Sequence, residues 1–206
     1  MMKKIWLLTV VIFAAVSATA AKNRILPPPQ KSGGMSLQEA LNTRHSVRSF
    51  QTKELTAQQL ANILWCANGI NRDNGKRTAP SALDKREVMI YVALPDGVYF
   101  YDPEQHIKDG NLPKISETDV RKFCGRYDAP CYLILVPDKT NQPREIFAAI
   151  DTGYVSQNIY LAAQANGLGT CAMGSIVDRD MLIRELGLGK NIPLLVHPLG
   201  FAKITP

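Results

Sequence analysis

Two arginines separated by three residues form the most distinctive chemical pattern in the sequence. Arg44 and Arg48 bracket His45 and Ser46 in the segment RHSVRSF, residues 44–50. A guanidinium can hold phosphate oxygens through paired hydrogen bonds, and a hydroxyl with neighbouring backbone N–H groups adds further donors. The segment therefore indicates a compact cradle for one anionic group, although such a pattern also occurs in ordinary solvent-exposed turns.

Two further segments combine small and polar residues in a way that suits ligand contact. RTAPSA, residues 77–82, precedes an apolar strand, and either its backbone and Ser81 face a ligand or it is a stiff connecting loop. GLGTCAMG, residues 167–174, is not a dinucleotide loop, because Ala172 replaces the third glycine and the segment follows a helix. It instead predicts a strand in which Gly174 allows the backbone to approach a flat ligand.

The composition narrows the kinds of site that this chain can hold. It has three histidines and four cysteines but no C-x-x-C pair, so a zinc site has little support. The net charge of +6 is mild and forms no long basic stripe. We therefore expect a small anionic ligand and no nucleic-acid partner. Cys124 and Cys131 could pair in an oxidising compartment, or all four cysteines could be small buried hydrophobic residues.

The predicted elements are interspersed without regular strand–helix alternation. A capping box at Ser36–Glu39 begins the first helix, Pro95–Gly97 forms a hairpin turn, and Gly167 and Gly187 end helices. The absence of regular alternation favours an α+β fold with an antiparallel or mixed sheet flanked by helices. Helices are expected over 36–43, 57–69, 117–124, 144–166 and 178–186, and strands over 86–94, 98–101, 130–136, 169–174 and 192–201.

The first twenty residues have the order of features expected of an export signal. Lys3 and Lys4 precede an apolar run from Ile5 to Val16, and Ala18-Thr19-Ala20 offers a cleavage site. The run is too short to span a bilayer, so no stable membrane anchor is expected. We predict a signal peptide over 1–20, an extended proline-rich arm over 21–35 and one domain over 36–206. The expected location is a bacterial periplasm.

The three ligand-contacting segments occur in this order in the nitroreductase family. The chain resembles that family over residues 36–203, through RHSVRSF (44–50), RTAPSA (77–82) and DTGYVSQNIYLAAQANGLGTCAMG (151–174). The resemblance implies a flavoprotein: an α+β homodimer with FMN bound at the subunit interface. It also implies the reduction of a small-molecule acceptor, such as a nitroaromatic, quinone or enone, in two alternating half-reactions.

Ten positions match the family's flavin-binding segments, and the resemblance implies the role of each. The phosphate and ribityl segment corresponds to Arg44, His45, Ser46 and Arg48, with a late basic phosphate contact near Lys203. The loop that reaches the flavin from the partner subunit corresponds to Pro80, Ser81 and Ala82, and the backbone beside flavin N5 and O4 to Met173 and Gly174. No catalytic side chain and no metal ligand is implied.

Two features leave the reaction open. Asp84 stands near the place of a family asparagine that hydrogen-bonds the flavin. Residues 80–106, PSALDKREVMIYVALPDGVYFYDPEQH, are closer to the FMN-dependent azoline dehydrogenases of modified-peptide maturation. The sequence therefore predicts an exported FMN-dependent oxidoreductase, with an azoline-type dehydrogenase or a flavin-binding module without turnover as alternatives. The electron donor is open, because soluble NAD(P)H is not expected outside the cytoplasm.

Overall fold

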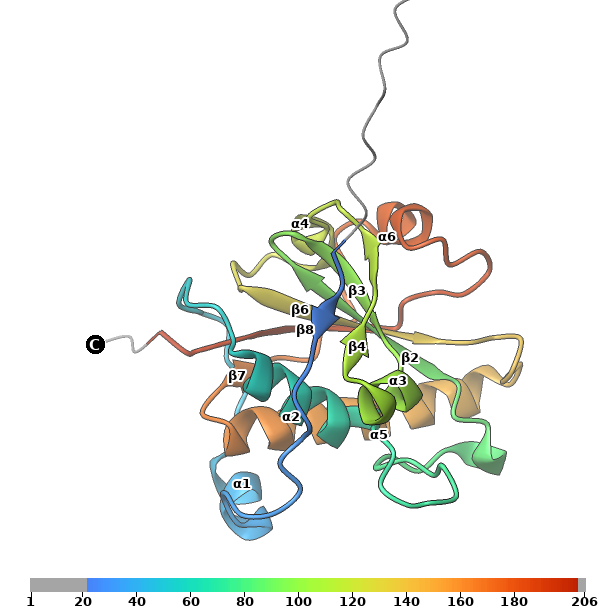
Figure 1. Cartoon of the computed structure of the whole chain (residues 1–206). Coiled ribbons are helices and arrows are strands. Elements are labelled where there is room, and N and C mark those ends of the chain that lie inside the picture. Colours follow the sequence, from blue (N-terminus) through green and yellow to red (C-terminus); the bar gives the residue numbers. More distant parts are fainter. Residues whose placement is uncertain (1–21, 204–206) are drawn as a thin grey trace, which may run out of the picture.

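A six-stranded sheet forms the centre of the molecule in the computed structural model, which describes residues 22–203 (Figure 1). Its strand order is β5-β3-β2-β6-β8-β7, and every one of these neighbouring pairs is antiparallel. This arrangement confirms the predicted α+β class. The strands are β2 (Val88–Leu94), β3 (Gly97–Tyr101), β5 (Lys114–Ser116), β6 (Cys131–Pro137), β7 (Gly169–Thr170) and β8 (Leu195–Gly200).

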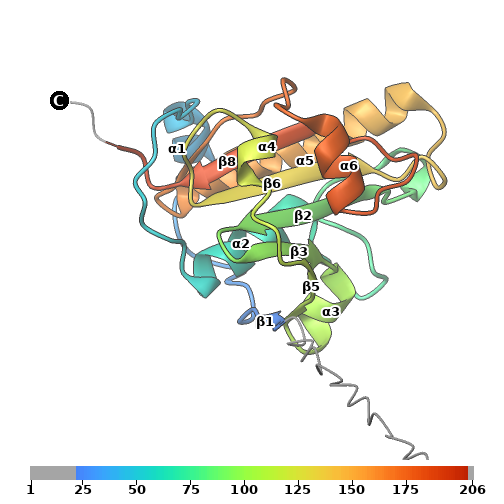
Figure 2. The same ribbon diagram turned by 90° about the horizontal axis from the view of Figure 1, so that it is seen from above.

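Helices cover both faces of this sheet (Figure 2). Helices α2 and α5 pack on one face and share a single apolar core with it, whereas α4 and α6 pack on the other. The helices are α1 (Leu37–Thr43), α2 (Ala57–Asn68), α3 (Pro103–Lys108), α4 (Arg121–Cys124), α5 (Glu145–Ala165) and α6 (Arg179–Glu185). A short 3-10 turn, η1, spans Ala82–Asp84.

The central strands are apolar throughout because each face of the sheet is buried. In β2, Ile90 and Val92 enter the core under α2 and α5, whereas Tyr91 and Ala93 enter the core under α4 and α6. All seven residues of β6 are buried, and β6 lies between β2 and β8. The prediction that the apolar run 130–136 is a central strand is therefore confirmed.

Helix α2 begins where its sequence signal predicts. Thr56 Oγ1 accepts the N–H of Gln59 at 3.1 Å, and the Gln59 side chain accepts the N–H of Thr56 at 3.1 Å. For α1, Ser36 Oγ accepts the N–H of Glu39 at 3.1 Å, which is one half of the predicted capping box. In both cases the cap satisfies a backbone donor that the first turn of a helix leaves free.

Several element boundaries differ from the sequence prediction. The strand expected over 169–174 is only the two-residue β7, followed by a single bridge between Met173 and Val196. The helix expected over 117–124 begins at Arg121. Helix α3 was not predicted, although Asp102 caps it and Pro103 occupies its first turn, which are ordinary helix-start signals.

The N-terminal arm runs along the molecule and pairs with it only briefly. Strand β1 (Arg24–Ile25) pairs with β4 (Asn111–Leu112), and Leu26 N–H donates to the Gly110 carbonyl at 2.8 Å. The predicted export signal over 1–20 lies outside the described residues. In the part of the chain that the structure describes, no helix is long and apolar enough to cross a membrane.

The cysteines of the described chain are free thiols. Cys124, Cys131 and Cys171 are buried, and Cys66 is half-buried. Burial raises the pKa of the Cys66 thiol and also that of Cys124. The cysteines therefore behave as small hydrophobic residues, which was the alternative to a Cys124–Cys131 disulfide.

Candidate functional site

Three segments that are distant in the sequence lie side by side near the C-terminal half of α5. Ser46 forms a parallel bridge with Thr170, and the N–H of Val47 donates to the Thr170 carbonyl at 2.9 Å. On the other side, the N–H of Lys203 donates to the Ser49 carbonyl at 3.0 Å. The structure thus brings together the predicted positions of residues 44–48, 173–174 and 203. We call these residues the cradle.

A close backbone approach makes this juxtaposition possible. Gly169 lies directly against Val47, and a Cβ added at Gly169 would come within 2.5 Å of the Val47 side chain. Any larger residue at 169 would push the two segments apart. Glycine is therefore needed here for packing rather than for an unusual backbone angle.

The two arginines of the cradle keep their hydrogen-bond donors available. Arg44 is half-buried, and its guanidinium lies 5.1 Å from the centre of the Tyr160 ring. Arg48 is exposed, and its Nη1 donates a long hydrogen bond of 3.4 Å to the Ser46 carbonyl. Within residues 22–203, neither arginine forms an ion pair with a carboxylate. This donor set fits a phosphate group, because two guanidiniums and a hydroxyl from one short segment have no carboxylate partner in the described residues.

Tyr160 of α5 connects two parts of the cradle. Its hydroxyl lies 3.0 Å from Ser46 Oγ and accepts the N–H of Ala172 at 2.8 Å. Met173 follows at once, with its side chain buried and its backbone N–H bonded to the Val196 carbonyl at 2.9 Å. The segment 172–174 is therefore held by α5 and by β8, and Gly174 is exposed at its end.

A buried histidine packs against the ring of Tyr160. His197 of β8 is fully buried, with Nε2 2.9 Å from Ser156 Oγ and Nδ1 3.1 Å from Thr170 Oγ1. Burial lowers its pKa to about 3, so the ring is neutral near neutral pH. Its ring meets the Tyr160 ring edge-on, with 5.6 Å between their centres. The sequence suggests Tyr160 only as an anchor of a dimer contact and gives His197 no role, because only the fold brings the two residues to the site.

The predicted loop 80–82 does not approach the cradle of its own chain. The N–H of Ala82 donates to Asp151 Oδ2 at 2.7 Å. Asp151 precedes Tyr160 by nine residues in α5, which is about 13 Å along a helix. One chain therefore presents the cradle and the loop at different places along α5.

The backbone after Ser81 is strained. Leu83, Asp84 and Arg86 have φ values of 57°, 54° and 52°, in the left-handed region that disfavours residues with a side chain. Arg86 grips both carboxylate oxygens of Asp84, at 2.9 and 2.7 Å. The Arg86 N–H donates to Ser81 Oγ at 2.7 Å, so the Ser81 hydroxyl is engaged within the loop.

Two carboxyl groups meet below this loop. Glu87 is buried, and no group of the described chain donates a hydrogen bond to either of its side-chain oxygens. Burial, followed by the neighbouring Asp151, raises the pKa of Glu87 to about 7. Two close carboxylates repel each other, so a proton held on Glu87 relieves the repulsion and leaves Asp151 free to accept from Ala82.

The run YDPEQH has a structural role that accounts for its residue types. Asp102 caps α3, and Pro103 begins it. His106 Nδ1 lies 3.1 Å from the Tyr101 hydroxyl, and its Nε2 lies 3.2 Å from the Pro27 carbonyl. These polar residues, on which the resemblance of residues 80–106 to azoline dehydrogenases partly rests, here join a strand, a helix and the arm.

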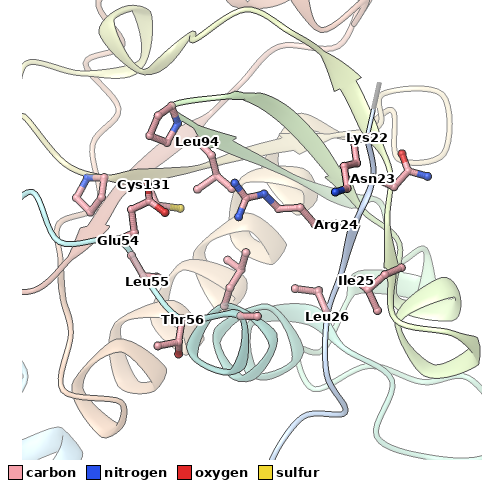
Figure 3. Close-up of a pocket in the computed structure, with 14 residues that line it drawn as sticks. Lys22, Asn23, Arg24, Ile25, Leu26, Glu54, Leu55, Thr56, Leu94 and Cys131 are labelled. Atoms are coloured by element: carbon pink, nitrogen blue, oxygen red, sulfur yellow. The ribbon is translucent and has the colours of Figure 1, made fainter. Parts of the chain in front are cut away.

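A pocket beside the arm is separate from the cradle. It has a volume of about 350 Å³, and none of the ten predicted flavin-binding residues lines it. Figure 3 shows Arg24 extending from the arm across this pocket. The Arg24 guanidinium already has partners in its own chain, because it forms an ion pair with Asp96 at 2.9 Å and lies 5.3 Å from the centre of the Tyr99 ring. We therefore place the candidate site at the cradle.

Comparison with known proteins supports the same assignment. The sequence profile of the nitroreductase family matches residues 41–201. A protein named as a nitroreductase from Methanocaldococcus jannaschii is 32% identical over 182 residues, which cover 81% of this chain and 91% of the relative. A relative from Methanothermobacter thermautotrophicus, named as an NADH dehydrogenase/NAD(P)H nitroreductase, is 30% identical and covers 85% of this chain and 82% of its own length.

A solved structure agrees with the sequence comparisons. A protein from Ralstonia eutropha JMP134, named as a nitroreductase, superimposes with a TM-score of 0.82 at 34% identity, and the match covers 91% of this chain and 92% of that chain. Profile, sequence and fold thus agree over nearly all the residues described. The chain belongs to the nitroreductase family of oxidoreductases.

Proposed function

We propose that this protein is an FMN-dependent oxidoreductase whose cradle binds the FMN phosphate. The observation that carries the proposal is the pair Arg44 and Arg48, which have no carboxylate partner in residues 22–203. Arg48 contacts the Ser46 carbonyl, and Arg44 lies over the ring of Tyr160, whose hydroxyl contacts Ser46 Oγ. Such donors are costly to assemble unless an external anion uses them. FMN is typical of the family and carries a single phosphate.

The residues of the chain would bind and orient the cofactor. When bound, FMN supplies two-electron redox chemistry, which no side chain of the cradle provides by itself. Arg44, Ser46 and Arg48 would hold the phosphate and the ribityl chain, with Lys203 near the phosphate. The backbone of Met173 and Gly174 would approach the flavin ring. An added Cβ at Gly174 would have no neighbour closer than 3.9 Å, so this stretch is open to a ligand.

We further propose a homodimer in which the exposed face of α5 lies at the interface. Ile146, Ile150 and Tyr154 recur at four-residue spacing, so they share one side of the helix, and they are exposed by 65, 44 and 47%. Leu37 and Leu41 on the neighbouring α1 are also exposed. Exposed large apolar side chains on two packed helices are typical of a surface that another chain covers.

We expect the substrate to be a small organic acceptor such as a nitroaromatic, a quinone or an enone. The export signal in residues 1–20 supports a role outside the cytoplasm, with a reductant other than NAD(P)H. The alternatives are an azoline-type dehydrogenase running in the oxidative direction and a flavin-binding module without turnover.

Purification without added cofactor tests the proposal. We expect a yellow protein that releases FMN, and neither FAD nor a nicotinamide, on denaturation. Reduction by dithionite followed by rapid re-oxidation with a quinone or nitroaromatic would support the oxidoreductase. Bound FMN that no organic acceptor re-oxidises would support the flavin-binding module. A colourless protein that does not take up added FMN would contradict the proposal.

A further inference from the structure

Tyr160 contacts the cradle through both its hydroxyl and its ring. Its hydroxyl contacts Ser46 Oγ and the N–H of Ala172, at 3.0 and 2.8 Å. The Arg44 guanidinium lies 5.1 Å from the centre of the Tyr160 ring. The His197 ring meets the Tyr160 ring edge-on, with 5.6 Å between the two ring centres. One side chain therefore touches both the phosphate side and the ring side of the candidate flavin site.

A tyrosine hydroxyl can accept one hydrogen bond and donate another at the same time. The oxygen of Tyr160 accepts from the Ala172 N–H, and its single proton is available for donation. Ser46 Oγ lies 3.0 Å away, and either hydroxyl can be the donor. A serine that accepts from tyrosine keeps its own proton for an external acceptor, such as a phosphate or ribityl oxygen.

The surroundings hold the tyrosine ring in one place. His197 is neutral and is bound on both ring nitrogens, by Ser156 and Thr170, so it forms a fixed support. On the open side, the Arg44 guanidinium is attracted to the electron-rich face of the Tyr160 ring. This attraction draws the Arg44 head group toward the cradle without neutralising its charge.

We propose that Tyr160 is a positioning residue of the flavin site, which holds Ser46, Arg44 and the 172–174 backbone in register with one another. The inference rests on the proposed FMN function. Tyr160 of α5 would not itself touch the phosphate. It would align the groups that touch the phosphate. Removing the hydroxyl should therefore disturb the phosphate side and the ring side together.

The first test compares Tyr160→Phe with Tyr99→Phe. The control also loses a hydroxyl that bonds a side chain, Asp96 at 2.7 Å, but Tyr99 lies in β3, three strands from β8 in the sheet. We expect Tyr160→Phe to weaken FMN binding about tenfold, because two hydrogen bonds are lost. The control should bind FMN as the wild type does. Equal FMN affinities for the wild type and Tyr160→Phe would overturn the inference.

The flavin midpoint potential separates positioning from simple stabilisation. Misaligned backbone donors should weaken binding of reduced FMN more than that of oxidised FMN. A further tenfold loss for the reduced form would lower the potential by about 30 mV. A lower melting temperature with an unchanged potential and affinity would show that Tyr160 only stabilises the fold, which would contradict the inference.

If Tyr160→Phe folds poorly, Ser46→Ala alone tests the contact by its effect on FMN affinity and midpoint potential. If both variants fold, a double-mutant cycle measures their coupling. Ser46→Ala removes the same hydrogen bond from the other end and leaves α5 intact. We expect the combined variant to lose less FMN affinity than the two single losses multiplied, because both act on one contact. Independent effects would contradict the coupling. A wild-type protein that does not bind FMN would overturn the proposed function itself, and this inference with it.

Discussion

The two arginines of the cradle differ from three other arginines of this molecule, which form ion pairs. Arg24, Arg86 and Arg121 each pair with an aspartate at 2.9 Å or less, whereas Arg44 and Arg48 have no such partner in residues 22–203. Pairing would cost the cradle its attraction for an anion.

The buried Glu87 predicts a measurable pH dependence of stability. Its folded pKa of about 7 lies above the usual 4.5, so the folded state holds more protons between these values. The free energy of unfolding therefore falls as pH rises through this window. Glu87→Gln removes the ionisation and keeps a donor toward Asp151. We expect it to raise the melting temperature at pH 8 by about 2–4 °C, which corresponds to ~1 kcal/mol.

Thermal unfolding at pH 5 and pH 8 measures this effect, with Glu54→Gln as the matched control. Glu54 is exposed, so the control should keep the wild-type pH profile. A Glu87→Gln protein whose stability declines as steeply as that of the wild type would show that Glu87 does not carry the proton.

Residue types in the sequence predicted the arginines and the serine of the cradle, but not the residues that hold them in place. Arg44, Ser46 and Arg48 were identifiable because they lie within five residues of one another, and their chemistry is evident from the sequence. Tyr160 and His197 are 37 residues apart and meet only after α5 packs on the sheet. Whether any of them contacts FMN stays a prediction.

At the scale of elements, the sequence predicted a helix or strand correctly where a local start signal and a buried apolar face occur together. Helix α2 has both a complete capping box and a buried face, and it begins at Ala57 as predicted. The strand over 169–174 was predicted too long. Its small residues match a strand, but continuous pairing with β8 covers only Gly169 and Thr170, and beyond them a single bridge joins Met173 to Val196. Helix α3 was missed because six residues carry too little periodicity.

Helix α5 carries the test of the proposed interface. Gly153 is exposed, and a Cβ added there would meet nothing within 4 Å in its own chain, so the side chain added by Gly153→Leu can extend into solvent in the isolated subunit. If two chains pack on this face, the bulky side chain should disrupt the dimer. Because the site would span both chains, we expect dimer fraction and FMN content to fall together, by about tenfold for a cost of ~1.4 kcal/mol.

Sedimentation analysis with flavin quantification measures both properties on the same samples. Gly153→Ala is the matched control, because alanine is small and favours the helix. It should stay dimeric and retain FMN. A Gly153→Leu monomer that holds FMN at wild-type affinity would contradict a shared site.

At the scale of the molecule, the distance between cradle and loop suggests why two chains would be needed. The cradle adjoins the C-terminal half of α5, whereas the loop that contains Ala82 adjoins its N-terminal half, at Asp151. If two α5 helices crossed antiparallel about a two-fold axis, the cradle of each chain would face the loop of its partner. The strained and exposed residues of that loop would then gain contacts.

The predicted export signal leads to a proposal about the electron donor. If residues 1–20 direct export, soluble nicotinamide cofactors are not expected where the protein works, and the donor would then be another small molecule, a quinol or a protein. In stopped-flow measurements on the FMN-loaded protein without residues 1–20, we expect millimolar NADH and NADPH to reduce the flavin more slowly than a quinol analogue. Reduction by NADPH within seconds, with steady turnover on a nitroaromatic or quinone, would contradict this.

The central claim is that the cradle binds the FMN phosphate, and an FMN titration of Arg48→Ala tests it most directly. Loss of one charged hydrogen bond, worth about 1.5–3 kcal/mol, should weaken binding roughly tenfold to a hundredfold. Arg184→Ala is the control, because Arg184 is exposed on α6, where only Met181 accepts its hydrogen bond. The account predicts weaker binding for Arg48→Ala and wild-type binding for Arg184→Ala. Wild-type FMN affinity and occupancy in Arg48→Ala would contradict it.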